Sequence, residues 1–126
     1  MLPERLLLAR DGEALRRLLE SSGVPRDTAA RYVARMREPG ALSAALAWYR
    51  AIPLAVRDTV GRVTVPTLHV WSTGDVALGR AATERTRDHV DAPYRLEVLE
   101  GVPHWIPELA AERTAELVTA HVRTAA

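Results

Sequence analysis

Two short apolar runs separated by a helix-length segment constrain the fold of this chain more than any other feature. VPTLHVW (65–71) and YRLEVLE (94–100) are rich in the apolar and β-branched side chains of strands. The 22 residues between Trp71 and Tyr94 include ALGRAATERTRDHVDAP, which predicts one amphipathic helix. A strand, a helix and a second strand in this order predict a βαβ unit with parallel strands.

Three amphipathic helices are expected before this unit. The first begins at Asp11 and stops at Gly23, the second ends at Pro39–Gly40, and the third closes at Pro53. Their apolar positions recur at helical spacing, which favours one buried face on each helix. The first half of the chain is therefore expected to be helical.

A last helix is expected from about Pro107, a residue suited to a first helical turn. Its apolar face consists of Leu117, Val118 and Val122. The predicted order is three helices followed by βαβα, which is an α/β fold class. We expect a helical segment at 1–52 and an α/β part at 53–126, with IPLAVRDTVGRV, around 52–63, as the connection.

Composition narrows the classes of partner. Seventeen basic and sixteen acidic side chains give a net charge of +1, without the arginine-rich runs that bind nucleic acid. No apolar run approaches the roughly 20 residues that span a bilayer, and the first residues are too charged for a signal peptide. We therefore expect a cytoplasmic protein that binds neither nucleic acid nor membrane. The absence of cysteine excludes disulfides, thiolate metal sites and cysteine nucleophiles.

The loops after the two predicted strands each hold a titratable residue. Asp75 lies four positions beyond Trp71, and His104 lies four positions beyond Glu100. Parallel strands end at the same sheet edge, and neighbours are about 4.8 Å apart, so we expect the two side chains to meet. A carboxylate bonded to one imidazole nitrogen leaves the other nitrogen able to take a proton from a nucleophile or a water. The pair would supply two thirds of a catalytic triad.

A structural interpretation stays open for both residues. Asp75 follows a glycine, a combination common in turns, and His104 can pack against Trp105 or bond a carbonyl group. Their equal offsets favour the catalytic interpretation, because turn chemistry does not require them. The other histidines share no metal-ligand spacing and are interpreted as structural or solvated; they are His69, His89 and His121.

Three segments together resemble the last third of the α/β-hydrolase fold, in which the catalytic acid and histidine follow two late strands. They are VPTLHVWSTGD, ALGRAATE and YRLEVLEGVPHWIPE. The upstream stretch YVARMREPGALSAALAWYRA resembles the helical cap of the soluble epoxide hydrolase branch, whose LNWYR motif reads LAWYR here, with Ala47 replacing asparagine. The resemblance covers nearly the whole chain. It implies a partial α/β-hydrolase fold with an N-terminal helical cap segment and a βαβα C-terminal unit.

The resemblance also implies roles for individual residues. Asp75 would be the catalytic acid, His104 the general base, Tyr49 a cap tyrosine that polarises the oxirane oxygen, and Trp105 a wall of the cleft. Tyr49 lies on the same apolar stripe as three other cap residues, Leu42, Ala45 and Leu46. A packing role is therefore the alternative for Tyr49. Tyr32 is a candidate for the second tyrosine of the family's active site.

The family's nucleophile is missing from this sequence. No GxSxG motif or aspartate equivalent is present, and Met1 falls about where the family's cap begins. We therefore expect the C-terminal portion of an epoxide hydrolase-like enzyme, inactive alone, that acts on a small molecule once completed by an N-terminal half. No cofactor or metal is implied.

Alternatives to this function remain. One is a non-catalytic half-protein that pairs with a complementing chain or as a homodimer through its exposed sheet edge. Another is a fragment of an esterase or of a haloalkane dehalogenase-like enzyme. A third is a small hydrolase in which His104 activates water by itself.

Overall fold

The chain divides into two units in the computed structural model, Met1–Val60 and Gly61–Ala126. The structure describes residues 2–55 and 61–125. The expected connection around 52–63 is described only in part, because its residues 56–60 lie outside the described part of the chain.

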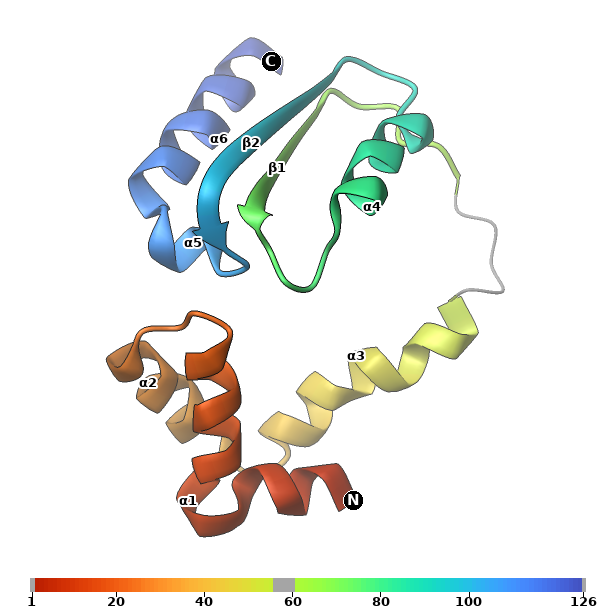
Figure 1. The fold of residues 1–126 in the computed structure, drawn as a ribbon. Coiled ribbons are helices and arrows are strands. Elements are labelled where there is room, and N and C mark those ends of the chain that lie inside the picture. The colour runs from red at the N-terminus through yellow and green to blue at the C-terminus, as the bar shows by residue number, and fades with distance from the viewer. Residues whose placement is uncertain (1, 56–60, 126) are drawn as a thin grey trace. The chain divides into compact units, whose positions relative to one another are not determined.

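The first unit contains three helices, as expected: α1 (Leu2–Ser21), α2 (Arg26–Met36) and α3 (Ala41–Ala55) (Figure 1). Helix α1 is interrupted, because Ala9 to Gly12 have non-helical backbone angles. The sequence pattern does not predict the segment before this break, and the expected start at Asp11 lies inside the break, so helical geometry resumes only after Gly12. Gly12 has a φ of 84°, and a Cβ there would lie 2.5 Å from Cγ1 of Val33, so only glycine allows α2 to pack against the break.

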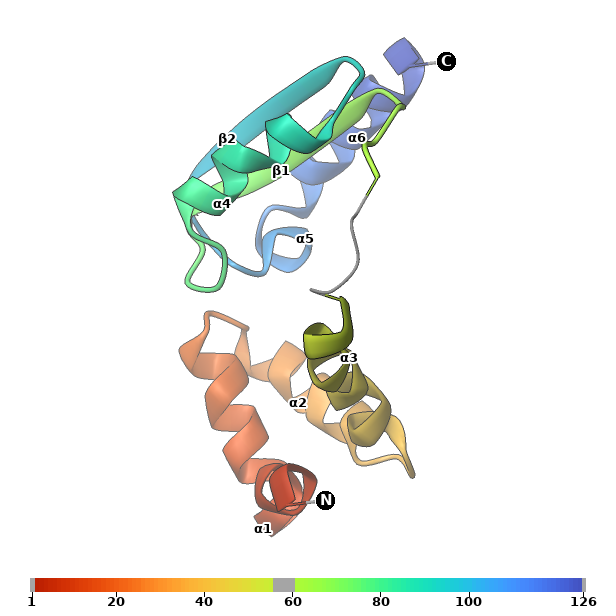
Figure 2. The same ribbon diagram turned by 90° about the vertical axis from the view of Figure 1, so that its right-hand side faces the viewer.

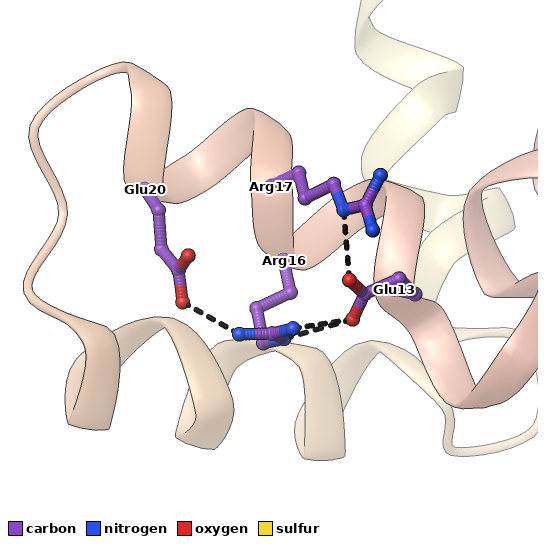
Figure 3. A network of polar contacts seen from close by, with 4 residues as sticks. All are labelled: Glu13, Arg16, Arg17 and Glu20. Carbon is purple, nitrogen blue, oxygen red and sulfur yellow. Dashed lines mark hydrogen bonds and ion pairs between the residues drawn. The ribbon is translucent and has the colours of Figure 1, made fainter.

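The core of the first unit is small and aliphatic. Its buried apolar side chains are Leu15, Val24, Ala29, Val33 and Leu42. Helix α1 also carries an ion-pair network, in which the half-buried Arg16 bonds both Glu13 and Glu20, and the exposed Arg17 also bonds Glu13 (Figure 3). Pairs three and four residues apart stabilise one helix by a few tenths of a kcal/mol each, roughly, so the network supports α1 locally.

Helix α3 extends past its expected end. Pro53 lies inside the helix, which continues to Ala55. Proline removes one backbone donor, and because this turn is exposed, water can satisfy the carbonyl group that loses its partner.

The second unit is built on a two-stranded sheet of β1 (Thr67–Gly74) and β2 (Tyr94–Pro103). The strands are parallel, with Thr67 opposite Tyr94 and Ser72 opposite Leu99, which confirms the predicted βαβ unit. Helix α4 (Arg80–Arg85) covers one face of this sheet and α6 (Ala111–Ala125) covers the other (Figure 1, Figure 2). The buried apolar side chains of the unit are Trp71, Val90 and Leu117.

The crossover is shorter than the predicted helix over 77–93. Helix α4 has six residues and is followed by the 3₁₀ turn η1 (Thr86–His89). Val90 is already extended, and it forms a parallel bridge with Val63. Backbone hydrogen bonds of that bridge therefore replace the last helical turns.

The C-terminal helix is also divided, into α5 (Ile106–Leu109) and α6, with Ala110 out of helical geometry between them. Pro107 occupies the first turn of α5, as predicted. Of the predicted apolar face, Leu117 is buried, whereas Val118 and Val122 are 47% and 61% exposed. The second unit thus leaves part of this face uncovered.

The pairing of β1 and β2 changes register near the ends of the strands. Ser72 is opposite Leu99, but Gly74 is opposite Pro103. One residue of β1 therefore spans three residues of β2, which is a β-bulge.

No helix among the described residues is both long and apolar enough to cross a membrane.

Candidate active site

Asp75 and His104 meet at the carboxyl ends of the two strands. Each is the first residue after its strand, and Nδ1 of His104 lies 2.9 Å from Oδ1 of Asp75. The contact expected from the positions of these residues in the sequence is therefore confirmed. Their catalytic role stays a prediction that geometry alone does not test.

Oδ1 of Asp75 also organises the loop that follows β1. It accepts hydrogen bonds from the backbone N–H of Ala77 (2.7 Å) and of Leu78 (3.0 Å). The turn chemistry considered as an alternative is thus present together with the histidine contact, on the same oxygen atom. The Asp75 side chain is only 5% exposed, so the protein itself must satisfy this carboxylate.

The electrostatics of this pair favour a charged aspartate. Burial of Asp75 raises its pKa, but the hydrogen bonds from His104, Leu78 and Ala77 outweigh burial and hold the pKa below its usual value. An ionised carboxylate only accepts hydrogen bonds, so the proton of the 2.9 Å contact belongs to Nδ1 of His104. In the neutral ring, Nε2 is then the basic nitrogen.

Trp71 holds the same loop through a second hydrogen bond. Its indole Nε1–H donates to the carbonyl oxygen of Leu78 at 2.8 Å, and the Arg80 guanidinium lies 5.0 Å from the ring centroid. The peptide groups of Leu78 are therefore fixed by Asp75 at the N–H and by Trp71 at the C=O. The sequence pattern indicates only a strand at Trp71, although a buried tryptophan usually needs an acceptor for its N–H.

Trp105 packs edge-on against the catalytic candidate His104. The ring centroids are 5.7 Å apart, with an interplanar angle of 79°. The backbone N–H of Ile106 donates to the carbonyl oxygen of His104 at 3.0 Å, so the start of α5 also fixes this histidine. The packing expected in the structural interpretation is again present beside the Asp75 contact.

Tyr49 belongs to the other unit, on α3. Its side chain is 72% exposed among the described residues, and that of its neighbour Trp48 is 81% exposed. Both the packing role and the oxirane role of Tyr49 stay predictions. Tyr32, the candidate for a second active-site tyrosine, lies half-buried on α2.

The remaining histidines have structural surroundings or are exposed. Nδ1 of His69 lies 2.9 Å from the hydroxyl of Tyr94, and Nε2 of His121 lies 3.3 Å from the carbonyl oxygen of Pro66. His89 is exposed in η1. Within residues 2–55 and 61–125, no three metal-ligating side chains are grouped so as to hold an ion.

A surface hollow of about 220 Å³ lies at the opposite end of the strands from Asp75 and His104. It is lined by Pro66, Thr67, Pro93, Tyr94, Arg95, His121, Thr124 and Ala125. Half of these residues directly precede or begin a strand, whereas Asp75 and His104 follow the strand ends, so the hollow is separate from the Asp75–His104 pair.

The arrangement can transfer protons. The Asp75 side chain is buried and oriented by three donors, whereas the His104 side chain is 38% exposed. A fixed carboxylate beside an accessible imidazole stabilises the imidazolium form and orients the ring. His104 can therefore take a proton from a water or a nucleophile and return it.

Comparison with known proteins identifies several related hydrolases. The chain is 27% identical over 121 residues to Epoxide hydrolase 3 of Xenopus tropicalis, which covers 86% of this chain and 32% of that protein. It is 30% identical over 115 residues to Epoxide hydrolase 4 of Mus musculus, covering 84% and 32%. It is also 30% identical over 110 residues to AB hydrolase superfamily protein YfhM of Bacillus subtilis, covering 83% and 38%.

The chain spans about a third of the length of the curated relatives it matches. No protein-family model matches it.

Proposed function

Because this chain is a distant homologue of epoxide hydrolases and corresponds to part of an α/β-hydrolase, we propose that Asp75 and His104 are the acid and the general base of an active site that adds water to an epoxide. The observation that carries the proposal is the 2.9 Å hydrogen bond between a buried carboxylate and a partly exposed imidazole at the ends of two parallel strands. In open α/β sheets this edge is where ligands bind.

The proposed reaction has two steps. A nucleophile from a portion of the protein beyond these 126 residues attacks an epoxide carbon and breaks its C–O bond, which forms an alkyl-enzyme. Nε2 of His104 then takes a proton from a water, whose oxygen hydrolyses the alkyl-enzyme and releases a diol. The carboxylate of Asp75 stabilises the imidazolium that forms.

Tyr49 is proposed to assist the first step. Its hydroxyl would donate a hydrogen bond to the oxirane oxygen as negative charge develops there, and would then give that oxygen its proton. The tyrosinate regains a proton through solvent when the imidazolium of His104 releases the one taken from water. The 72% exposure of Tyr49 on α3 supports the proposal, since a packed tyrosine could not reach a substrate. Trp105, against the edge of His104, is proposed to line the cleft.

We further propose that the chain works together with a portion that supplies the nucleophile, either in one longer protein or as a complementing chain. Two observations support this. The matched segment is about a third of each relative's length, and α6 exposes Val118 and Val122. Exposed apolar side chains on a helix face are typical of a surface that another part of a protein covers.

The test uses the protein as purified from its source, with an epoxide, an ester and a haloalkane as substrates. His104→Ala should lower epoxide turnover by roughly 10² to 10⁴, the usual contribution of a general base. Tyr49→Phe should lower it by about 10² while sparing ester hydrolysis, because only the oxirane needs that donor. Tyr94→Phe is the matched control, since its hydroxyl bonds His69 at the other end of the sheet.

Full epoxide turnover by the His104→Ala protein would overturn the proposal. Turnover of the ester or the haloalkane alone would instead assign the same Asp75–His104 pair to an esterase or a dehalogenase.

A further inference from the structure

The register shift between the strands decides which residue faces Asp75. From Thr67 to Ser72, each β1 residue pairs with the β2 residue that lies 27 positions later in the sequence. Continued without a shift, this register would set Val102 opposite Asp75. After the bulge the separation is 29, as between Gly74 and Pro103, and Asp75 and His104 have the same separation.

We propose that Thr73 is a positioning residue that holds the β-bulge and so delivers His104 to Asp75. The inference concerns the geometry of the pair, and its importance for hydrolysis rests on the function proposed above. Without the bulge, an apolar side chain would replace the imidazole beside the Asp75 carboxylate, which would lose one of its three donors.

The hydroxyl of Thr73 bonds the bulge twice. Its Oγ1–H donates to Oε2 of Glu100 at 2.9 Å, and Oγ1 accepts from the backbone N–H of Gly101 at 2.9 Å. Thr73 is also the single β1 residue that lies opposite three residues of β2. One side chain thus ties the centre of the bulge to the opposite strand, where regular ladder bonds are lost.

Two glycines make the bulge sterically possible. Gly101 has a φ of 70°, which side-chain-bearing residues rarely adopt, although a Cβ there would meet nothing within 4 Å. At Gly74 a Cβ would lie 2.6 Å from the carbonyl oxygen of Val102, so glycine allows the bulged backbone to approach β1. Gly101 supplies the conformation, Gly74 supplies the clearance, and Thr73 supplies two hydrogen bonds beside the longer one (3.5 Å) from the Ser72 hydroxyl to the carbonyl oxygen of Pro103.

The test measures the tautomer of His104 by NMR of its ring nitrogens in the full chain. In the parent protein Nδ1 should carry the proton at neutral pH, because Nδ1–H donates a hydrogen bond to the Asp75 carboxylate. Thr73→Val keeps the shape of the side chain but removes both hydrogen bonds, and it should reduce the Nδ1–H tautomer to less than half of the molecules. Thr73→Ser keeps the hydroxyl and should preserve the parent tautomer.

Thr124→Val is the control, since that hydroxyl bonds only carbonyl groups of its own helix. A folded Thr73→Val protein that keeps the parent tautomer would overturn the inference. Gly101→Ala provides a second route if Thr73→Val does not fold. The Gly101→Ala substitution strains only the bulge and should also shift the tautomer. A folded Gly101→Ala protein that keeps the parent tautomer would overturn the inference.

The tautomer reports the geometry without any turnover, which separates this inference from the proposed function. A shifted tautomer with unchanged epoxide turnover in the source protein would refute the proposed function and leave the role of Thr73 intact. A shifted tautomer with a lower kcat would support both.

Discussion

Replacing Asp75 by alanine should destabilise the second unit far more than replacing it by asparagine. Alanine removes the acceptor of three hydrogen bonds, from Ala77, Leu78 and His104. Because the Asp75 side chain is 5% exposed, water cannot fully replace that acceptor. At about 1 kcal/mol for each lost bond, and somewhat more for bonds to a charged group, the loss in the free energy of unfolding should be about 3 kcal/mol.

Asparagine keeps an oxygen in the position of Oδ1 and loses only the charge. The two backbone N–H groups then retain an acceptor, so Asp75→Asn should cost about 1 kcal/mol. The difference of about 2 kcal/mol between the two variants measures how far the carboxyl oxygen organises its loop. Asp88→Ala, at an exposed position in η1, is the control and should stay within about 0.5 kcal/mol of the parent.

Urea unfolding of the full chain, followed by tryptophan fluorescence, provides the measurement. A Trp48→Phe background removes the tryptophan of the first unit, so that Trp71 and Trp105 report only on the second. If Asp75→Ala and Asp75→Asn lose the same free energy, or if Asp75→Ala loses less than 1 kcal/mol, roughly, then Oδ1 does not hold this loop and the reasoning is wrong.

Three further outcomes follow from the described contacts. The depressed pKa of Asp75 stabilises the fold above the ordinary aspartate value of about 3.9, and this stabilisation should disappear as pH falls through the lower folded value, which acid titration of the parent against Asp75→Asn can measure. The hydrogen bond from Arg50 is the largest of several that lower the pKa of Glu4 to about 2, so Arg50→Ala should raise this pKa part of the way toward the usual value of about 4.3. It should also remove part of the stability that is otherwise kept until pH falls through about 2; carboxyl NMR measures the titration, and an unchanged Glu4 titration would contradict this. Trp71→Phe should lower the free energy of unfolding by about 1 kcal/mol through the lost bond to Leu78, whereas Trp48→Phe, at 81% exposure, should have no measurable effect; equal effects would refute the role of the indole N–H.

The parallel strands and the Asp75–His104 contact were predictable from the sequence, but partly for a reason that the sequence does not reveal. The sequence places the two residues equally far beyond Trp71 and Glu100, whereas Trp71 is opposite Val98 in the sheet. The bulge adds the two positions that restore the alignment. Strand pattern and turn residues predict where β2 begins, but no periodicity marks a bulge whose bonds come from Thr73 on the other strand.

Helix boundaries were less predictable where tertiary contacts compete with local pattern. The crossover segment has helical composition throughout, yet bonding between Val63 and the backbone around Val90 ends the helix early. The break in α1 depends on Val33 of a different helix. The Trp71 bond to Leu78 likewise depends on a loop conformation that Asp75 creates. The first two features require knowledge of a partner distant in sequence, and the third requires knowledge of a loop conformation.

The central claim is that His104, oriented by Asp75, activates the water that completes epoxide hydrolysis. A single-turnover reaction of the source-purified protein with a simple epoxide, followed by intact-protein mass spectrometry and diol analysis, tests it most directly. The parent protein should release diol without accumulating an adduct, whereas His104→Gln should accumulate a covalent adduct with the mass of the epoxide and release little diol. Release of diol by His104→Gln at the parent rate would contradict the claim.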